Sequence, residues 1–159
     1  MLNFFKENFE IFAPVDGFFI KISDVPDKIF SQKVIGDGIA IRAVGEIVSS
    51  PIDGKIIEIF DTNHVFIIEG KSGVQIIVHI GINTIELQGN GFERLIREGE
   101  SVKVGDPIIK MDRDEINKKE QDLMVPIIIA NMDNVNITKY CDLKYVKRGQ
   151  DIILKYCVK

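Results

Sequence analysis

The residues best suited to chemistry are the two histidines of the chain, His64 and His79. His79 interrupts an apolar run in the stretch GVQIIVHIGINT, residues 73–84. Side chains alternate between the two faces of a strand, so His79 shares a face with Ile77 and Gly81. Imidazole is the side chain whose ordinary pKa lies nearest neutrality, so its place in an apolar strand marks His79 as a candidate for chemistry.

The stretch EGKSGV, between two β-like runs, predicts a hairpin that pairs the two histidines. A loop of Lys71-Ser72, or of the four residues 70–73, sets His64 directly opposite His79 on one face. Residues opposed in this way have Cβ atoms about 4.5–5.5 Å apart. An odd-length loop would slip the register by one residue and move one histidine to the other face. The predicted pairing therefore depends on an even loop.

Three kinds of role suit two adjacent imidazoles, and the first is purely structural. The second is a metal site, either a two-histidine metal-binding protein or a zinc hydrolase-like β domain. Catalytic zinc requires three protein ligands and structural zinc four, so we expect no intrinsic metal, although His64 and His79 could hold adventitious zinc. The third role is nucleophilic catalysis, in which one imidazole forms a covalent intermediate and the other stabilises its charge.

The neighbours of the histidines fit a phosphoryl group carried on His79. The Gly81 carbonyl can accept the Nδ1 proton of His79, which leaves Nε2 as the nucleophile, and the glycine leaves room for a donor. His64 can donate an N–H to a phosphate oxygen, while Thr62 bonds its other nitrogen and fixes its tautomer. Apolar surroundings would exclude water and slow hydrolysis, which favours a carrier over a hydrolase.

The elements that position these residues are predicted to be short strands. Runs of four to eight residues, rich in Ile and Val, predict an all-β fold: an antiparallel sandwich or barrel with Greek-key or jelly-roll-like connections. Two stretches have helical spacing, GFERLIREG at 91–99 and DRDEINKKEQD at 112–122. The runs predicted as strands are GFFIKI, GIAIRAV, GEIVSS, GKIIEIF, HVFIIEG, VQIIVHIG, ESVKV, DPIIKM and VPIIIA.

An internal repeat relates APVDGFFIKISD, residues 13–24, to SPIDGKIIEIFD, residues 50–61. In both copies Pro-x-Asp-Gly opens a strand, because proline fixes φ and glycine accepts a positive φ. The repeat predicts two related half-motifs packed within a single domain that spans residues 1–159. Residues 1–10 are predicted to form a flexible N-terminal tail.

The composition indicates a globular protein with a packed core, at 45% hydrophobic and 28% charged residues. Its net charge of -4 argues against nucleic-acid partners and favours a partner protein with a basic surface. Charges interrupt every apolar run and the N-terminus lacks signal-peptide features, which predicts a cytoplasmic protein without direct membrane insertion. Cys141 and Cys157 have no CxxC spacing, so both are predicted to be reduced strand residues.

Several blocks of the sequence resemble one known family. GVQIIVHIGINTI, residues 73–85, is similar to the phosphohistidine signature of the glucose-family enzyme IIA components of the bacterial phosphoenolpyruvate-dependent sugar phosphotransferase system. The resemblance extends from about residue 11 to the C-terminus. Its further blocks, in the same order, are VPDKIFSQKVIGDGIAI, SPIDGKI, FDTNHVFIIE, ELQGNGFERLIREGESVKVGDPIIKMD and VPIIIANMD.

The resemblance implies that His79 is phosphorylated at Nε2 by the histidine phosphocarrier protein HPr, with no cofactor required. The group would then pass to a cysteine of a sugar-specific enzyme IIB domain, whose membrane-embedded IIC partner transports the sugar. His64 would be the second active-site histidine and Thr62 its hydrogen-bond partner. The implied fold is an antiparallel β-sandwich with a shallow, apolar active-site depression.

The resemblance also implies a partner-binding surface around the histidines. Asp37, in IGDGIAI, matches an acidic residue that meets a basic residue of HPr. We expect Ile35, Val78 and Ile80 to add apolar contacts. Asn83 stands where many relatives carry an aspartate, so one anionic contact becomes neutral and the affinity for HPr falls modestly. The sugar stays open among glucose, N-acetylglucosamine, sucrose and β-glucosides.

A rival interpretation is a carrier domain for biotin or lipoate. SPIDGKI and GESVKVGDPIIKMD are similar to strands of such domains. Those domains need a modifiable lysine in a Met-Lys-Met or Asp-Lys-Ala setting, and the sequence contains neither.

Overall fold

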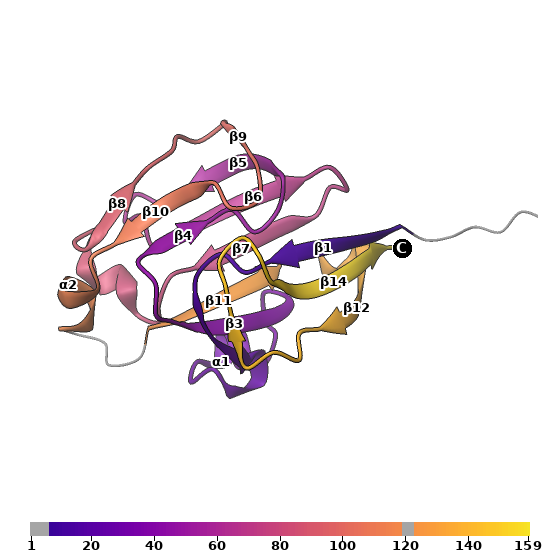
Figure 1. The fold of residues 1–159 in the computed structure, drawn as a ribbon, viewed down its shortest axis with the longest axis horizontal. Coiled ribbons are helices and arrows are strands. Elements are labelled where there is room, and N and C mark those ends of the chain that lie inside the picture. The colour runs from indigo at the N-terminus through magenta and orange to yellow at the C-terminus, as the bar shows by residue number, and fades with distance from the viewer. Residues whose placement is uncertain (1–6, 119–122) are drawn as a thin grey trace, which may run out of the picture.

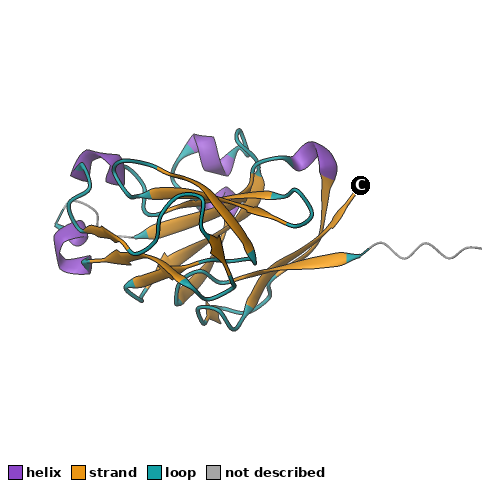
Figure 2. Cartoon of the chain, turned by 90° about the horizontal axis from the view of Figure 1, so that it is seen from above, coloured by secondary structure: helices purple, strands orange, loops and turns teal. Residues whose placement is uncertain are grey.

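The computed structural model describes residues 7–118 and 123–159, and strands make up most of their regular structure (Figure 1). These strands form one eight-stranded sheet and two three-stranded sheets, and the strand pairs are antiparallel. The prediction of an all-β antiparallel sandwich is therefore confirmed. Figure 2 shows that the helical turns are short and that strands dominate the view from above as well.

The eight-stranded sheet runs in the order β13 (Tyr145–Val146), β2 (Gly17–Lys21), β3 (Asp37–Ala43), β11 (Met124–Ile129), β7 (Gln75–His79), β6 (Val65–Gly70), β5 (Gly54–Ile59) and β9 (Ser101–Val102). One small sheet contains β1 (Asn8–Phe12), β14 (Ile152–Val158) and β12 (Val135–Tyr140), and the other contains β4 (Ile47–Ser49), β10 (Pro107–Met111) and β8 (Phe92–Arg94). The helices are α1 (Lys28–Ser31) and α2 (Arg113–Asn117), with 3-10 turns η1 (Ile22–Asp24), η2 (Thr84–Leu87) and η3 (Met132–Asn134).

Each of the nine apolar runs predicted as a strand overlaps an observed strand. The helix predicted at 91–99 is wrong, because Phe92–Arg94 form β8, paired with β10. Gly91 and Gly99 bound this segment with φ values of 90° and 87°, in the left-handed region that a continuous α-helix does not use. The helix predicted at 112–122 is confirmed as α2 for Arg113–Asn117, and residues 119–122 lie outside the described residues.

Two hydrophobic clusters lie on the two faces of the large sheet. Successive residues of β3 show the division, because Ile39 and Ile41 join the main cluster whereas Ala40 joins the second. The main cluster draws on residues along most of the chain and fills the interior of the sandwich. The second is smaller, and η1 and α1 cover it with residues such as Phe30. The second cluster therefore depends on the short segment between β2 and β3.

The internal repeat corresponds to a repeated structural unit. β2 and β5 each begin at the glycine of a Pro-x-Asp-Gly copy. Asp16 Oδ1 accepts the backbone N–H of Arg148 at 2.7 Å, and Asp53 Oδ1 accepts that of Val104 at 2.8 Å. Arg148 and Val104 occupy the same place in two further matching segments, VKRG and VKVG. Each aspartate thus ties its strand to an equivalent distant turn, which explains why both copies retain it.

β1 begins inside the segment predicted to be a flexible N-terminal tail. Residues 8–10 belong to β1, which pairs with β14, so the prediction of a flexible tail is wrong for them. Phe9 also stacks on Tyr156, with ring centroids 5.2 Å apart. Residues 1–6 lie outside the described residues.

The two cysteines are free thiols. Cys157 is a strand residue of β14, as predicted, whereas Cys141 directly follows the last residue of β12. Across residues 7–118 and 123–159, no helix has the length and apolar character needed to cross a membrane.

We predict that Gly38→Ala lowers the free energy of unfolding by about 3 kcal/mol, because the new Cβ would overlap the Ile127 carbonyl oxygen of the neighbouring strand. Gly45→Ala is the matched control, since its Cβ would lie 3.4 Å from the Asp16 Cβ, an ordinary contact. Urea unfolding followed by circular dichroism measures both variants. Equal stability of the two would contradict the close approach of β3 and β11.

Candidate functional site

The hairpin that carries the histidines has a different register from the predicted one. β6 pairs with β7 so that Val65, not His64, lies opposite His79. The loop contains three residues, Lys71 to Gly73, because Gly73 adopts a φ of 81° and its N–H bonds to the Gly70 carbonyl. The predicted even loop and the direct strand pairing of the histidines are therefore wrong.

The two imidazoles nevertheless meet, because His64 lies just before β6 and outside the strand alternation. Its backbone carbonyl accepts the Ile80 N–H at 2.6 Å. The ring centroids of His64 and His79 are 5.1 Å apart and the rings are nearly perpendicular, at 87°. A turn residue thus brings the rings together where strand pairing alone would separate them.

The sheet ends at His79 for two local reasons. β11 pairs with β7 up to Ile127, opposite Val78, and the next residue of β11 in this register is Pro126, opposite His79. Proline has no N–H to donate, so the ladder stops there. On the other side of His79, Gly81 turns the chain with a φ of 83°, which glycine adopts without strain.

This turn determines which ring nitrogen of His79 holds the proton. The Gly81 carbonyl lies 2.7 Å from His79 Nδ1 and accepts its proton, so Nε2 keeps the lone pair of the neutral ring. The Thr62 hydroxyl lies 2.6 Å from His64 Nδ1. The structure thus brings together the four residues predicted to do the chemistry, His79, His64, Thr62 and Gly81.

Aromatic side chains that the sequence did not single out complete the surroundings. Phe30 contacts His79 edge to face at 5.1 Å, and Phe60 contacts His64 in the same way at 5.9 Å. Phe30 lies on α1, which Asp27 caps by accepting the Ile29 N–H at 2.9 Å. An aspartate directly before a short apolar helix is an N-cap signal that could have revealed α1.

The residues predicted to bind a partner fall into different environments. Val78 and Ile80 are fully buried in the main core cluster, so their predicted role in partner contact is wrong. Alternation along β7 sends Val78 into the interior and His79 to the opposite face. Ile35 and Asn83 are exposed, and Asn83 adopts a left-handed φ of 63° at the start of η2.

Asp37 does not lie beside His79, contrary to the prediction. It pairs with Ile129, which in turn pairs with Ile76, three residues along β7 from His79 and two strands away. Its carboxylate accepts the Tyr140 hydroxyl at 2.6 Å. The carboxylate whose charge acts on His79 is that of Asp27, which the sequence analysis missed.

Burial lowers the pKa of both imidazoles. The pKa of His64 falls from 6.5 to about 4, chiefly through burial and further through the nearby His79. Burial also lowers the pKa of His79, although the Gly81 carbonyl and the Asp27 carboxylate partly offset this effect. Both rings are therefore neutral at pH 7, and each holds one proton and one lone pair.

This arrangement suits a nucleophile with an adjacent hydrogen-bond donor. His79 offers a lone pair at Nε2, and the Thr62 hydroxyl, by donating to His64 Nδ1, would leave the proton of His64 on its Nε2. Among the described residues no group of three or more His, Cys, Asp or Glu side chains could hold a metal ion. A catalytic zinc ion would need a third protein ligand from elsewhere.

Comparisons with known proteins show the family to which this chain belongs. The family model described as phosphoenolpyruvate-dependent sugar phosphotransferase system, EIIA 1, matches residues 9–135, and the chain belongs to this family. It is 46% identical over 148 residues to the PTS system glucose-specific EIIA component of Haemophilus influenzae, covering 91% of this chain and 87% of that protein.

Two further relatives agree with this assignment. The PTS system N-acetylglucosamine-specific EIICBA component of Escherichia coli is 41% identical over 125 residues, which are 79% of this chain but 19% of that protein. The solved glucose permease IIA from Mycoplasma capricolum has a TM-score of 0.87 at 32% identity and covers 97% of this chain and 99% of its own. The chain is thus a phosphotransferase component of the sugar phosphotransferase system.

The lowered pKa of His64 predicts a pH-dependent stability. Between pH 6.5 and about 4 the unfolded imidazole binds a proton that the folded one does not, so stability falls as the pH drops. At pH 5 the His64 imidazole lowers the free energy of unfolding by about 2 kcal/mol relative to pH 7. We predict that, from pH 7 to pH 5, the free energy of unfolding falls by about 2 kcal/mol less in His64→Gln than in the wild type. Urea unfolding at the two pH values measures this difference. Equal losses would contradict a buried, neutral His64.

Proposed function

We propose that this chain is a phosphocarrier that accepts a phosphoryl group on His79 from phospho-HPr and passes it to a cysteine of an enzyme IIB domain. The observation that carries the proposal is the hydrogen bond from His79 Nδ1 to the Gly81 carbonyl, at 2.7 Å. This bond leaves the Nε2 lone pair of a neutral imidazole available for attack on phosphorus. Membership of the EIIA 1 family supports the same role.

The acceptance step exchanges one P–N bond for another. The Nε2 lone pair of His79 attacks the phosphorus atom, the P–N bond to the donor imidazole breaks, and the donor leaves with the bonding electron pair. The proton stays on His79 Nδ1, hydrogen-bonded to the Gly81 carbonyl, and the phosphorylated ring carries a delocalised positive charge. The carbonyl stabilises this charge because it already points at the proton.

His64 is proposed to stabilise the transferring phosphoryl group. In this role the Thr62 hydroxyl, 2.6 Å from His64 Nδ1, would donate to that nitrogen and so hold the ring proton on Nε2, beside His79. His64 is only 2% exposed, so its N–H acts in surroundings with little competing water. The His64 ring is neutral at pH 7, because its pKa lies well below that value.

The onward step reverses the bonding at His79. A cysteine thiolate of the IIB domain attacks phosphorus, the P–Nε2 bond breaks, and its electron pair returns to Nε2. The name of the Escherichia coli relative, EIICBA, joins the letters of the A, B and C components in one protein, which supports IIB and IIC as partners. No cofactor is part of the proposal. The named sugars of the relatives, glucose and N-acetylglucosamine, leave the sugar open.

The docking surface for HPr is proposed to surround the exposed edge of His79. Asp27 takes the anionic role first assigned to Asp37, since its charge acts on His79. Ile35 and Asn83 are exposed and remain candidates for contact. Asn83 contributes a neutral amide there, so we expect the charge complementarity with HPr to rest more heavily on Asp27.

Phosphorylation assays separate the roles of the two histidines. After incubation with phosphoenolpyruvate, enzyme I and HPr, intact mass should show one acid-labile phosphate on the wild type and none on His79→Gln. His64→Gln should still accept the phosphate but transfer it onward about a hundredfold more slowly, because His64 acts on the transition state. Normal labelling of His79→Gln would disprove the assignment of the nucleophile.

A second assay separates Asp27 from Asp37. We predict that Asp27→Asn slows transfer from phospho-HPr about fivefold at low salt and less at high salt, because a steering charge is lost. Asparagine also caps helices, so α1 should persist in this variant. Asp37→Asn is the control and should change the rate less than twofold. The opposite ranking, measured by rapid-quench kinetics, would restore Asp37 as the partner contact.

A further inference from the structure

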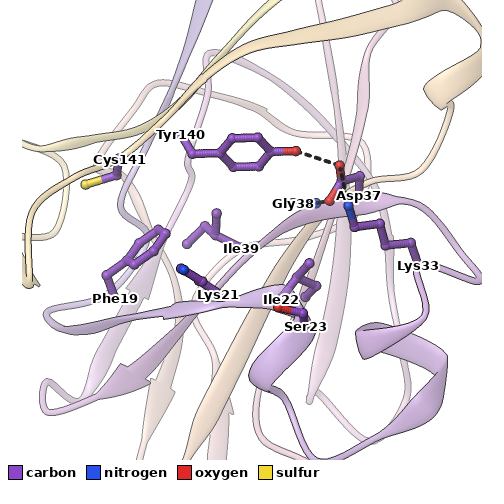
Figure 3. A pocket seen from close by; sticks show the side chains of 10 residues that line it. All are labelled: Phe19, Lys21, Ile22, Ser23, Lys33, Asp37, Gly38, Ile39, Tyr140 and Cys141. Atoms are coloured by element: carbon purple, nitrogen blue, oxygen red, sulfur yellow. Dashed lines mark hydrogen bonds and ion pairs between the residues drawn. The ribbon is translucent and has the colours of Figure 1, made fainter.

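A cavity of about 310 Å³ lies between the start of β3 and the end of β12 (Figure 3). Its walls are mostly apolar, and its volume is at the lower end of the range for small-ligand pockets. Figure 3 shows Tyr140 on one side of the cavity, with Phe19 and Lys21 on the other. The residues that line it are Phe19, Lys21, Ile22, Ser23, Lys33, Asp37, Gly38, Ile39, Tyr140 and Cys141.

This cavity is separate from the histidine site. Ile39 lines it and belongs to the main core cluster, whereas Ala40, the next residue, belongs to the cluster on the face of His79. The two sites therefore use opposite faces of the same strand. They meet at the segment between β2 and β3, which contributes Ile22 of the second cluster, with Ser23 and Lys33, to the cavity and Phe30 to the contact with His79.

The polar groups of the cavity leave one positive charge unmatched. The Asp37 carboxylate is already satisfied, because Oδ1 accepts the Gly38 N–H at 2.8 Å and Oδ2 accepts the Tyr140 hydroxyl at 2.6 Å. Lys33 Nζ lies 3.4 Å from the same Oδ2 and balances its charge. Lys21 forms no ion pair with any described residue. Lys21 is therefore the lysine of the cavity lining whose charge no described carboxylate balances.

We propose that this cavity binds a small monocarboxylate with a compact apolar body. The carboxylate would pair with the Lys21 ammonium, and the apolar body would pack between Phe19 and Ile39. A single negative charge matches the one unpaired lysine, whereas a second would approach the Asp37 carboxylate and be repelled. The apolar walls supply most of the binding free energy, and the lysine selects for the anion.

Phenylacetate is a suitable probe, with phenylacetamide as its uncharged counterpart. In ¹H–¹⁵N NMR titrations of the full chain, phenylacetate should shift the amide signals of Ser23, Gly38 and Cys141 and saturate in the millimolar range. Phenylacetamide should bind at least fivefold more weakly. Lys21→Met should weaken phenylacetate at least fivefold, whereas Lys55→Met, an exposed strand lysine on β5, should leave it unchanged.

A chemical readout tests the same site independently. Cys141 lines the cavity, so phenylacetate at saturation should slow its alkylation by iodoacetamide several-fold, as measured by intact mass. Cys157 is buried and serves as the internal reference. Unsaturable shifts, equal binding of acid and amide, or an unchanged affinity in Lys21→Met would each overturn the proposal. None of these outcomes depends on phosphorylation of His79.

Discussion

The hydrogen bond between His79 Nδ1 and the Gly81 carbonyl is the interaction on which the proposed chemistry of the site depends. Neutral imidazole has one proton for two nitrogens, and the nitrogen that keeps its lone pair is the one that can react. The carbonyl decides between them, because it accepts only from Nδ1. Burial adds to this choice by lowering the pKa of the ring, so that it does not fill both nitrogens with protons at pH 7.

The rest of the fold positions this bond. Pro126 ends the ladder of β11 and β7 at His79, and the left-handed turn at Gly81 returns the chain carbonyl to the ring. On the other side, the three-residue loop of the hairpin leaves His64 in the turn before β6, where its ring meets His79. Phe30 completes the site from α1, so several segments outside regular strand structure converge on one pair of rings.

The sequence predicted much of this arrangement because its strongest signals are local. The strands that open at Pro-x-Asp-Gly, the Ile- and Val-rich runs and the spacing of Thr62 from His64 depend on few residues and agree with the structure, but neither Gly17 nor Gly54 has the positive φ predicted for it. The hairpin register failed because it depends on the φ of Gly73, which the sequence leaves free. The residue pattern at 91–99 fits a helix equally well, and only pairing with β10 decides for a strand.

Long-range placement was harder to predict than chemistry. Asp37 and Asp27 both precede short apolar runs, and only the course of the strands shows which one approaches His79. Val78 and Ile80 flank His79 in sequence, yet alternation buries both in the interior. Proximity in the sequence thus predicted the turn at Gly81 correctly, but it did not predict which residues form the surface that a partner can reach.

The proposed phosphocarrier requires that His79 carries its proton on Nδ1 and reacts at Nε2. Imidazole ¹⁵N labelling with long-range ¹H–¹⁵N NMR tests it directly, since the chain has only two histidines. At pH 7 we expect His79 to have a protonated Nδ1 and a lone pair on Nε2. After phosphorylation we expect Nε2 to show coupling to phosphorus. A proton on Nε2 of the unmodified ring, or phosphorus coupled to Nδ1, would contradict it.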